Sequence, residues 1–132
     1  MLAQLKKYDA VIVGAGLSGM YQMIKLRQLG LSARILEMGS DVGGTWYWNR
    51  YPGARFDSES YSYGMSFSKE LLQEWEWSEH FSSQPETLRY CQYIAAKFDL
   101  KRDIVFNERV TGAEYDATSK TWLVKTADMA LK

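Results

Sequence analysis

The sequence predicts an α/β fold built on a parallel sheet, and three observations lead to this prediction. A short β-branched strand runs into a glycine-rich turn, an apolar helix pattern begins directly after that turn, and a second apolar strand follows the helix. Strand–helix–strand units with short connections form right-handed crossovers between parallel strands. The 132 residues, of which 46% are hydrophobic and 24% charged, fit one globular domain.

The first strand is expected at residues 8–14, where Ala10-Val11-Ile12-Val13 is an apolar run typical of a strand buried on both faces. A helix follows from Leu17 to Leu29, because its apolar residues recur near helical spacing. Gly30 stands where a helix C-terminus often places a left-handed residue. The second strand is predicted at residues 33–37.

The rest of the chain divides into a long loop, a helix and short strands. From about residue 38 to 68 the periodicity disappears and Gly, Ser, Tyr and Trp dominate, which indicates a functional loop. Ser83-Gln84-Pro85-Glu86 resembles a capping box and predicts a helix that runs to about Phe98. Short strands are expected at 103–106, 109–115 and 121–126, the last two joined by a turn as part of an antiparallel meander.

Composition and charge exclude several function classes. The 16 acidic and 16 basic residues balance, so the chain has no long-range field to attract nucleic acid. No run approaches the roughly 20 apolar residues that span a bilayer, and no signal-peptide pattern follows Lys6-Lys7. We therefore expect a cytoplasmic protein that binds neither membrane nor nucleic acid.

The single cysteine and the single histidine both suggest structural rather than chemical roles. Cys91 excludes an internal disulfide framework and lies on the apolar face of its predicted helix, so we expect it to be buried and inert. His80 is the only histidine and has no suitable second metal ligand near it, so a solvated or hydrogen-bonded surface histidine is expected rather than a metal-binding or catalytic one. No metal site is predicted.

The strongest chemical motif is Gly14-Ala15-Gly16-Leu17-Ser18-Gly19, a G-x-G-x-x-G between the first strand and the first helix. The first glycine permits the tight turn, the second lets backbone approach a diphosphate, and the third lets helix and strand pack closely. The N–H groups of the helix N-terminus attract the phosphates. Glu37 follows at the end of the second strand, where a carboxylate accepts hydrogen bonds from ribose hydroxyls.

This pattern predicts a Rossmann-like adenine-dinucleotide site, against the alternative of a glycine-rich turn beside a surface glutamate. The carboxylate of Glu37 repels a 2′-phosphate, which makes NADP an unsuitable ligand for this pocket and leaves FAD and NAD. Gly43-Gly44 comes soon after Glu37 and leaves backbone room for a large ring system, which favours FAD. An NAD-dependent dehydrogenase would continue with strand–helix alternation, but an aromatic loop follows.

The run from Gly43 to Asp57, GGTWYWNRYPGARFD, resembles the flavin-site loop of Baeyer-Villiger monooxygenases, which are related to the flavin-containing monooxygenases. The likeness continues through Tyr61-Ser62-Tyr63 and Ser83-Gln84-Pro85-Glu86 and extends to about Trp122. Phe56 departs from the small residue, often cysteine, that precedes the aspartate in the family.

The resemblance implies roles for individual residues. Thr45 and Trp46 would line the flavin and nicotinamide region, and Tyr63 would contact the flavin. Asp57 would lie beside the isoalloxazine ring as the catalytic residue of this chain, orienting a later arginine that stabilises a C4a-peroxyflavin. The alternatives are a plain loop carboxylate for Asp57 and a packed aromatic cover over a sheet edge for the loop. The expected cofactor-binding residues are Gly14, Gly16, Leu17, Ser18, Gly19, Glu37, Met38, Gly44, Thr45, Trp46, Asp57, Tyr63 and Val110.

The implied function is that of an FAD- and NADPH-dependent monooxygenase that inserts one oxygen atom from O2 into ketones or onto soft heteroatoms. Residues 1–132 would form the N-terminal part of its FAD-binding domain, because neither a second glycine motif for NADPH nor a C-terminal flavin-binding strand is found. The chain alone is then expected to be inactive and to associate with the missing part or with a second copy. The alternative is a non-catalytic dinucleotide-binding module or folding fragment.

Overall fold

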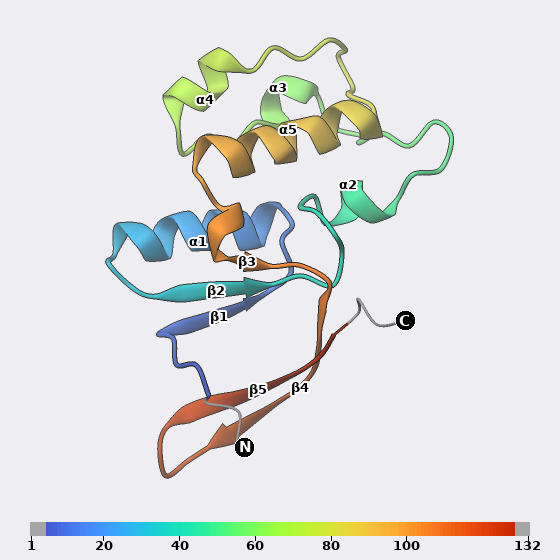
Figure 1. The fold of residues 1–132 in the computed structure, drawn as a ribbon. Helices are drawn as coiled ribbons and strands as arrows, with labels where there is room; N and C mark the ends of the chain where they lie inside the picture. The colour runs from blue at the N-terminus through green and yellow to red at the C-terminus, as the bar shows by residue number, and fades with distance from the viewer. Residues whose placement is uncertain (1–4, 129–132) are drawn as a thin grey trace.

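The computed structural model describes residues 5–128 and contains a three-stranded parallel sheet in the order β1-β2-β3 (Figure 1). β1 (Ala10–Val13) pairs with β2 (Ala33–Leu36) along its whole length, and β2 pairs with β3 (Ile104–Val105). α1 (Leu17–Gln28) connects β1 to β2 and covers one face of the sheet (Figure 1). The predicted parallel α/β architecture is confirmed.

The segment between β2 and β3 holds more helices than the sequence predicts. Residues 38–68, which the missing periodicity predicts as a loop, contain two one-turn helices, α2 (Thr45–Trp48) and α3 (Ser60–Tyr63). Helices this short have no room for an apolar repeat, so periodicity does not reveal them. The other helices of this segment are α4 (Lys69–Glu74), α5 (Gln84–Lys97) and the 3₁₀ turn η1 (Lys101–Asp103). Among residues 5–128 no helix is long and apolar enough to cross a membrane.

An antiparallel hairpin of β4 (Glu108–Asp116) and β5 (Thr121–Asp128) forms the third layer. In Figure 1 the sheet lies between α1 above and this hairpin below. The pairing register shifts between Val110 and Gly112, which marks an irregularity of the β-bulge type. The expected partial antiparallel addition near the C-terminus is confirmed. The strand predicted at 103–106 is only two residues long in the structure, and it pairs with the parallel sheet.

The core lies between the sheet, α1 and α5. Met20, Met23 and Ile35 are fully buried, and α5 adds Tyr90 and Ile94. Burying an aliphatic side chain of this size stabilises a fold by about 1.5–3 kcal/mol. This core fixes the ends of β1, α1 and β2 relative to one another.

The expectation that β1 is buried on both faces is wrong for the described residues. Ile12 is buried beneath α1, but Val11 is 38% exposed and Val13 is 66% exposed. Side chains alternate along a strand, so Val11 and Val13 share the face opposite α1. The β4–β5 hairpin lies on that side of the sheet but leaves both valines exposed, and among residues 5–128 β1 pairs only with β2.

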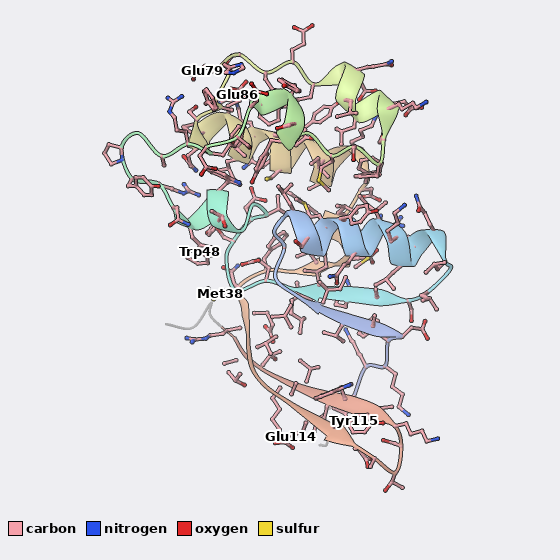
Figure 2. The ribbon with its side chains drawn as sticks, turned by 180° about the vertical axis from the view of Figure 1, so that it is seen from behind. Met38, Trp48, Glu79, Glu86, Glu114 and Tyr115 are labelled. Atoms are coloured by element: carbon pink, nitrogen blue, oxygen red, sulfur yellow. The ribbon has the colours of Figure 1, made fainter. Side chains whose placement is uncertain are left out.

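The N-terminus of α5 differs from the expected capping box. Ser83 has the extended backbone of an N-cap, and Pro85 lies in the first turn, but the side chain of Ser83 makes no capping hydrogen bond. Glu86 turns away from Ser83 and accepts hydrogen bonds from Ser78 N at 2.9 Å, Ser78 Oγ at 2.9 Å and Ser82 Oγ at 2.8 Å. Figure 2 shows Glu86 below Glu79 in this region. The carboxylate therefore fastens the preceding loop to α5.

This buried carboxylate predicts an acid-sensitive contact. Burial alone would raise the pKa of Glu86, but the hydrogen bonds from Ser78 and Ser82 outweigh it and lower the pKa below its ordinary value of 4.5. A lowered pKa in the folded state contributes stability above pH 4.5 that is lost as the pH falls through the folded value. We expect Glu86→Gln to lower the free energy of unfolding by about 1–3 kcal/mol at pH 7. The deficit should shrink in urea denaturation series taken towards pH 3.

The matched control for this prediction is Glu76→Gln, because Glu76 is exposed. Its unfolding free energy should follow that of the wild type across the whole pH series. Identical acid profiles for the wild type and Glu86→Gln would contradict the role given to the carboxylate.

Cys91 and His80 occupy the environments predicted for them. Cys91 is buried, and burial raises the pKa of its thiol to about 12, so the thiolate is scarce at neutral pH. His80 is exposed, and its Nε2 lies 3.2 Å from Glu59 Oε1. In the described part of the chain no group of three or more His, Cys, Asp or Glu residues is arranged to hold a metal ion.

Candidate functional site

The glycine turn after β1 is shaped by the conformation and small size of its residues. Gly14 has φ +96°, a left-handed conformation that favours glycine, and its N–H donates to Leu36 O at 2.8 Å. A Cβ on Gly19 would lie 2.0 Å from Gly14 O and 3.3 Å from Ile12 Cγ2. The tight turn at the first glycine and the close helix–strand packing at the third are thus confirmed.

The second glycine contacts another glycine turn. A Cβ on Gly16 would lie 3.4 Å from Gly44 Cα, and a Cβ on Gly44 would lie 2.9 Å from Gly16 Cα. Gly43 N donates to Ala15 O at 3.0 Å, which holds the two turns together. The turn after β1 and the turn before α2 therefore form one surface, although sequence spacing alone did not predict this contact.

Glu37 is buried and bound both to the turn after β1 and to the loop that directly follows β2. Its Oε2 accepts a hydrogen bond from Ala15 N at 2.7 Å, and its Oε1 accepts one from Gly39 N at 2.7 Å. A carboxylate has about four acceptor positions, so each oxygen keeps capacity for a ligand hydroxyl. The sequence predicts a sugar-binding carboxylate at this position but gives no sign of these two internal hydrogen bonds.

Two cavities open on either side of the Gly16–Gly44 contact. The larger has a volume of about 460 Å³, and the smaller has a volume of about 270 Å³. Both are lined by Val13, Gly14, Gly16 and Gly44, at the carboxyl end of β1. Ligands of open α/β sheets bind at this end of the strands. We treat the two cavities, which share these four lining residues, as one candidate site.

The larger cavity presents hydrogen-bond donors. It lies at the N-terminus of α1, whose first N–H groups have no partner within the helix, and it is lined by the hydroxyl residues Ser18, Thr45 and Tyr63. No acidic residue is among its lining residues. Positive helix-dipole ends and hydroxyl donors suit an anionic group such as a diphosphate. The other lining residues are Leu17, Gly19, Gly43 and Trp46.

The smaller cavity combines the carboxylate of Glu37 with largely apolar walls. Met38 is 44% exposed and Trp48 is 51% exposed, so both offer apolar surface to a planar group. Figure 2 shows Met38 after β2 and Trp48 on α2, on the same side of the molecule. Leu36, Glu108, Arg109 and Val110 complete the lining. The sequence predicts Met38 and Val110 as cofactor-binding residues but not Trp48 or Arg109. Only the fold shows that these two residues, from α2 and β4, line this cavity.

An aromatic cluster contributes Trp46 and Tyr63 to the lining of the larger cavity. The Phe56 ring stacks on Tyr63 with centroids 4.2 Å apart, and the Trp46 ring meets both of them edge-on at 5.8 and 6.1 Å. Trp46 Nε1 donates to the Tyr63 hydroxyl at 3.0 Å. Phe56, the residue that departs from the family pattern, is therefore accommodated as the centre of this cluster.

Asp57 lies apart from these cavities. Its side chain is exposed, and it is not a lining residue of either cavity in the described part of the chain. The other predicted cofactor residues all line at least one cavity. The structure thus brings the glycine turns, Glu37 and the aromatic residues together and leaves Asp57 outside the group.

Comparison with known proteins gives this arrangement a family context. Residues 12–75 match the family model of the NAD(P)-binding Rossmann-like domain. A 2-oxo-Δ³-4,5,5-trimethylcyclopentenylacetyl-CoA monooxygenase of Pseudomonas putida is 51% identical over 88% of this chain and 21% of its own length. A methyl acetate-forming acetone monooxygenase of Gordonia sp. (strain TY-5) is 46% identical over 91% of this chain and 22% of its own length.

Solved structures agree with these sequence matches. A steroid monooxygenase bound to NADP superimposes with a TM-score of 0.90 at 53% identity, covering 92% of this chain and 23% of that protein. OTEMO in complex with FAD and NADP superimposes with a TM-score of 0.87 at 49% identity, covering 92% of this chain and 23% of that protein. The chain spans about a fifth of the length of the curated relatives that it matches. It therefore belongs among the homologues of Baeyer-Villiger and related flavin monooxygenases and corresponds to their N-terminal portion.

Proposed function

We propose that this chain binds the ADP part of FAD in an NADPH-using monooxygenase that transfers one oxygen atom to a ketone or a soft heteroatom. The observation that carries the proposal is the paired cavity, with donors on one side of the glycine contact and a carboxylate on the other. The relatives support the same cofactor, because one solved homologue is a complex with FAD and NADP.

The residues fit this cofactor by their hydrogen-bonding chemistry. The larger cavity would hold the diphosphate, an acceptor-only group, against the α1 N-terminus and the hydroxyls of Ser18 and Thr45. Glu37 would accept hydrogen bonds from the ribose hydroxyls, and the apolar wall of Met38 and Trp48 would cover the adenine. A 2′-phosphate at this sugar would meet the Glu37 carboxylate, so NADP would need a different site.

The oxygen chemistry belongs to the flavin, which with NADPH and a proton reduces O2 so that one oxygen atom enters the substrate and the other leaves as water. The residues of this chain bind and orient the cofactor. A ketone substrate is supported by two relatives whose names are acetone monooxygenase and cyclohexanone 1,2-monooxygenase. We propose that residues 1–132 contribute the N-terminal part of the FAD-binding domain and that NADPH binds elsewhere in the complete protein.

We also propose a cytoplasmic location and an association between this chain and further protein segments. The one cysteine, Cys91, is a buried free thiol, which suits a reducing compartment. Among the described residues β1 leaves one edge of the sheet without a partner strand, and such an edge readily pairs with another chain segment.

Cofactor binding is tested by adding FAD to the purified chain and following flavin fluorescence and absorbance. We expect saturable binding of FAD and competition by ADP, because in this proposal the two cavities hold the ADP part. NADP should compete more weakly than NAD, because Glu37 repels its 2′-phosphate. A colourless chain that binds neither FAD nor ADP would instead favour a folding fragment without ligand affinity.

The catalytic assignment of Asp57 is tested in the complete enzyme. We expect Asp57→Ala to lose most ketone-dependent oxygen consumption with NADPH while FAD affinity is retained, because Asp57 lies outside both cavities. Glu76→Ala, which removes another exposed carboxylate, serves as the control and should leave both quantities unchanged. Unchanged turnover in Asp57→Ala would remove the residue from the mechanism.

A further inference from the structure

Trp46 and Tyr63 form the one side chain-to-side chain hydrogen bond that joins two lining residues of the larger cavity in the described part of the chain. The indole Nε1–H of Trp46 donates to the Tyr63 oxygen at 3.0 Å. An indole N–H only donates, whereas a phenol both donates and accepts. The direction of this hydrogen bond is therefore fixed, and the proton of Tyr63 is left for another acceptor.

The surroundings hold both rings in place. Trp46 is buried, and the amide Nε2 of Gln84 donates to its backbone oxygen. Phe56 stacks against Tyr63 at a centroid distance of 4.2 Å, which restricts the tilt of the phenol ring. Among the described residues the Tyr63 hydroxyl donates to no protein acceptor, and Tyr63 lines the cavity.

We propose that Trp46 is a positioning residue that, by donating to the Tyr63 oxygen, directs the Tyr63 O–H toward an acceptor atom of the dinucleotide in the larger cavity. The inference rests on the proposed FAD site and adds a fixed hydrogen-bond donor to it. The donor belongs to the larger cavity, which Tyr63 lines, whereas the carboxylate of Glu37 lines the smaller one.

The hydrogen bond from Trp46 to Tyr63 is tested first, without ligand, by NMR of the indole protons. The chain has five tryptophans, so each indole N–H can be assigned by substitution. In Tyr63→Phe the Trp46 indole proton should move upfield, because it loses its acceptor. Tyr61→Phe is the control, since Tyr61 is exposed and its hydroxyl contacts Glu59 instead. An unmoved Trp46 signal in Tyr63→Phe would overturn the proposal.

A second measurement without ligand uses the ionisation of Tyr63. Burial raises the pKa of Tyr63, and the hydrogen bond from Trp46 opposes that rise. Trp46→Phe should therefore raise the pKa of Tyr63 further, as followed by NMR of ¹³C-labelled tyrosine. Trp75→Phe is the matched control, because the buried Nε1 of Trp75 has no hydrogen-bond partner among the described residues. If Tyr63 has the same pKa in Trp46→Phe and in the wild type, the positioning role of Trp46 is overturned.

The contact from Tyr63 to the ligand is tested by a double-mutant cycle on the dissociation constant of FAD. Tyr63→Phe and Trp46→Phe should each weaken binding roughly three- to ten-fold, the size of one neutral hydrogen bond. The double variant should be no weaker than Tyr63→Phe alone, because Trp46 acts through the phenol. Trp75→Phe should bind FAD as the wild type does.

The outcomes separate this proposal from the one that it rests on. Effects of Trp46→Phe and Tyr63→Phe that add in the double variant would overturn the positioning role and leave the FAD site standing. A wild-type chain that binds no FAD would overturn both. If Trp46→Phe does not fold, the Tyr63→Phe variant alone tests the proposal. An upfield shift of the Trp46 indole proton together with weaker FAD binding supports it. Unchanged FAD binding rejects it.

Discussion

Gly19→Ala is expected to destabilise the protein by about 3 kcal/mol or more and to abolish dinucleotide binding. The added Cβ would lie 2.0 Å from Gly14 O, a backbone atom at the centre of the turn that cannot move without displacing β1 or α1. Urea denaturation measures the loss of stability, and FAD titration under conditions where the variant remains folded measures the loss of affinity.

The control for this prediction is Gly112→Ala, because a Cβ at Gly112 meets no atom within 4 Å. Its unfolding free energy should stay within about 1 kcal/mol of the wild-type value. A Gly19→Ala protein with wild-type stability and FAD affinity would show that the contact between α1 and the turn relaxes freely, against the packing described for the third glycine.

Glu37→Ala is expected to lower the free energy of unfolding by about 2–4 kcal/mol, because it leaves the amides of Ala15 and Gly39 without their charged acceptor. It should also remove the preference of the site for a ribose with both hydroxyls. The measurement is the affinity of wild type and variant for ADP and for 2′,3′-dideoxy-ADP.

These two effects of Glu37 have different readouts. Stability reports the internal hydrogen bonds to the turns, whereas the ratio of the two nucleotide affinities reports the contact to the sugar. Wild type should favour ADP, and Glu37→Ala should bind both nucleotides alike. An equal ratio in wild type and variant would confine Glu37 to a structural role.

The beginning of the fold was predictable because its signals are local. The β1–α1–β2 unit combines a β-branched strand, a helix with apolar periodicity and glycines with defined conformations, and Gly30 indeed has φ +72°. The one-turn helices α2 and α3 were not predictable, because tertiary contacts rather than a repeat stabilise them. The capping box at Ser83 was wrong because Ser78 and Ser82, which precede the helix, supply the partners of Glu86.

The conformation and close packing of the glycines were predictable, because glycine at a left-handed turn or a close approach has one physical purpose. The place of Glu37 directly after β2 was predictable from the strand pattern. Trp48 and Arg109 line the smaller cavity because of where α2 and β4 lie in the fold. The spacing of residues in the sequence does not predict that position. The two internal hydrogen bonds of Glu37 are equally a product of the folded turns.

The approach of Gly44 to Gly16 has a consequence for surveys of related sequences. Since a side chain at position 44 would press on the glycine turn after β1 at Gly16, a homologue with an intact G-x-G-x-x-G and a bulky residue in place of Gly44 should have a distorted turn and distorted cavities beside it. Searches that score the hexapeptide alone would accept such a homologue. Scoring both glycine turns together would reject it.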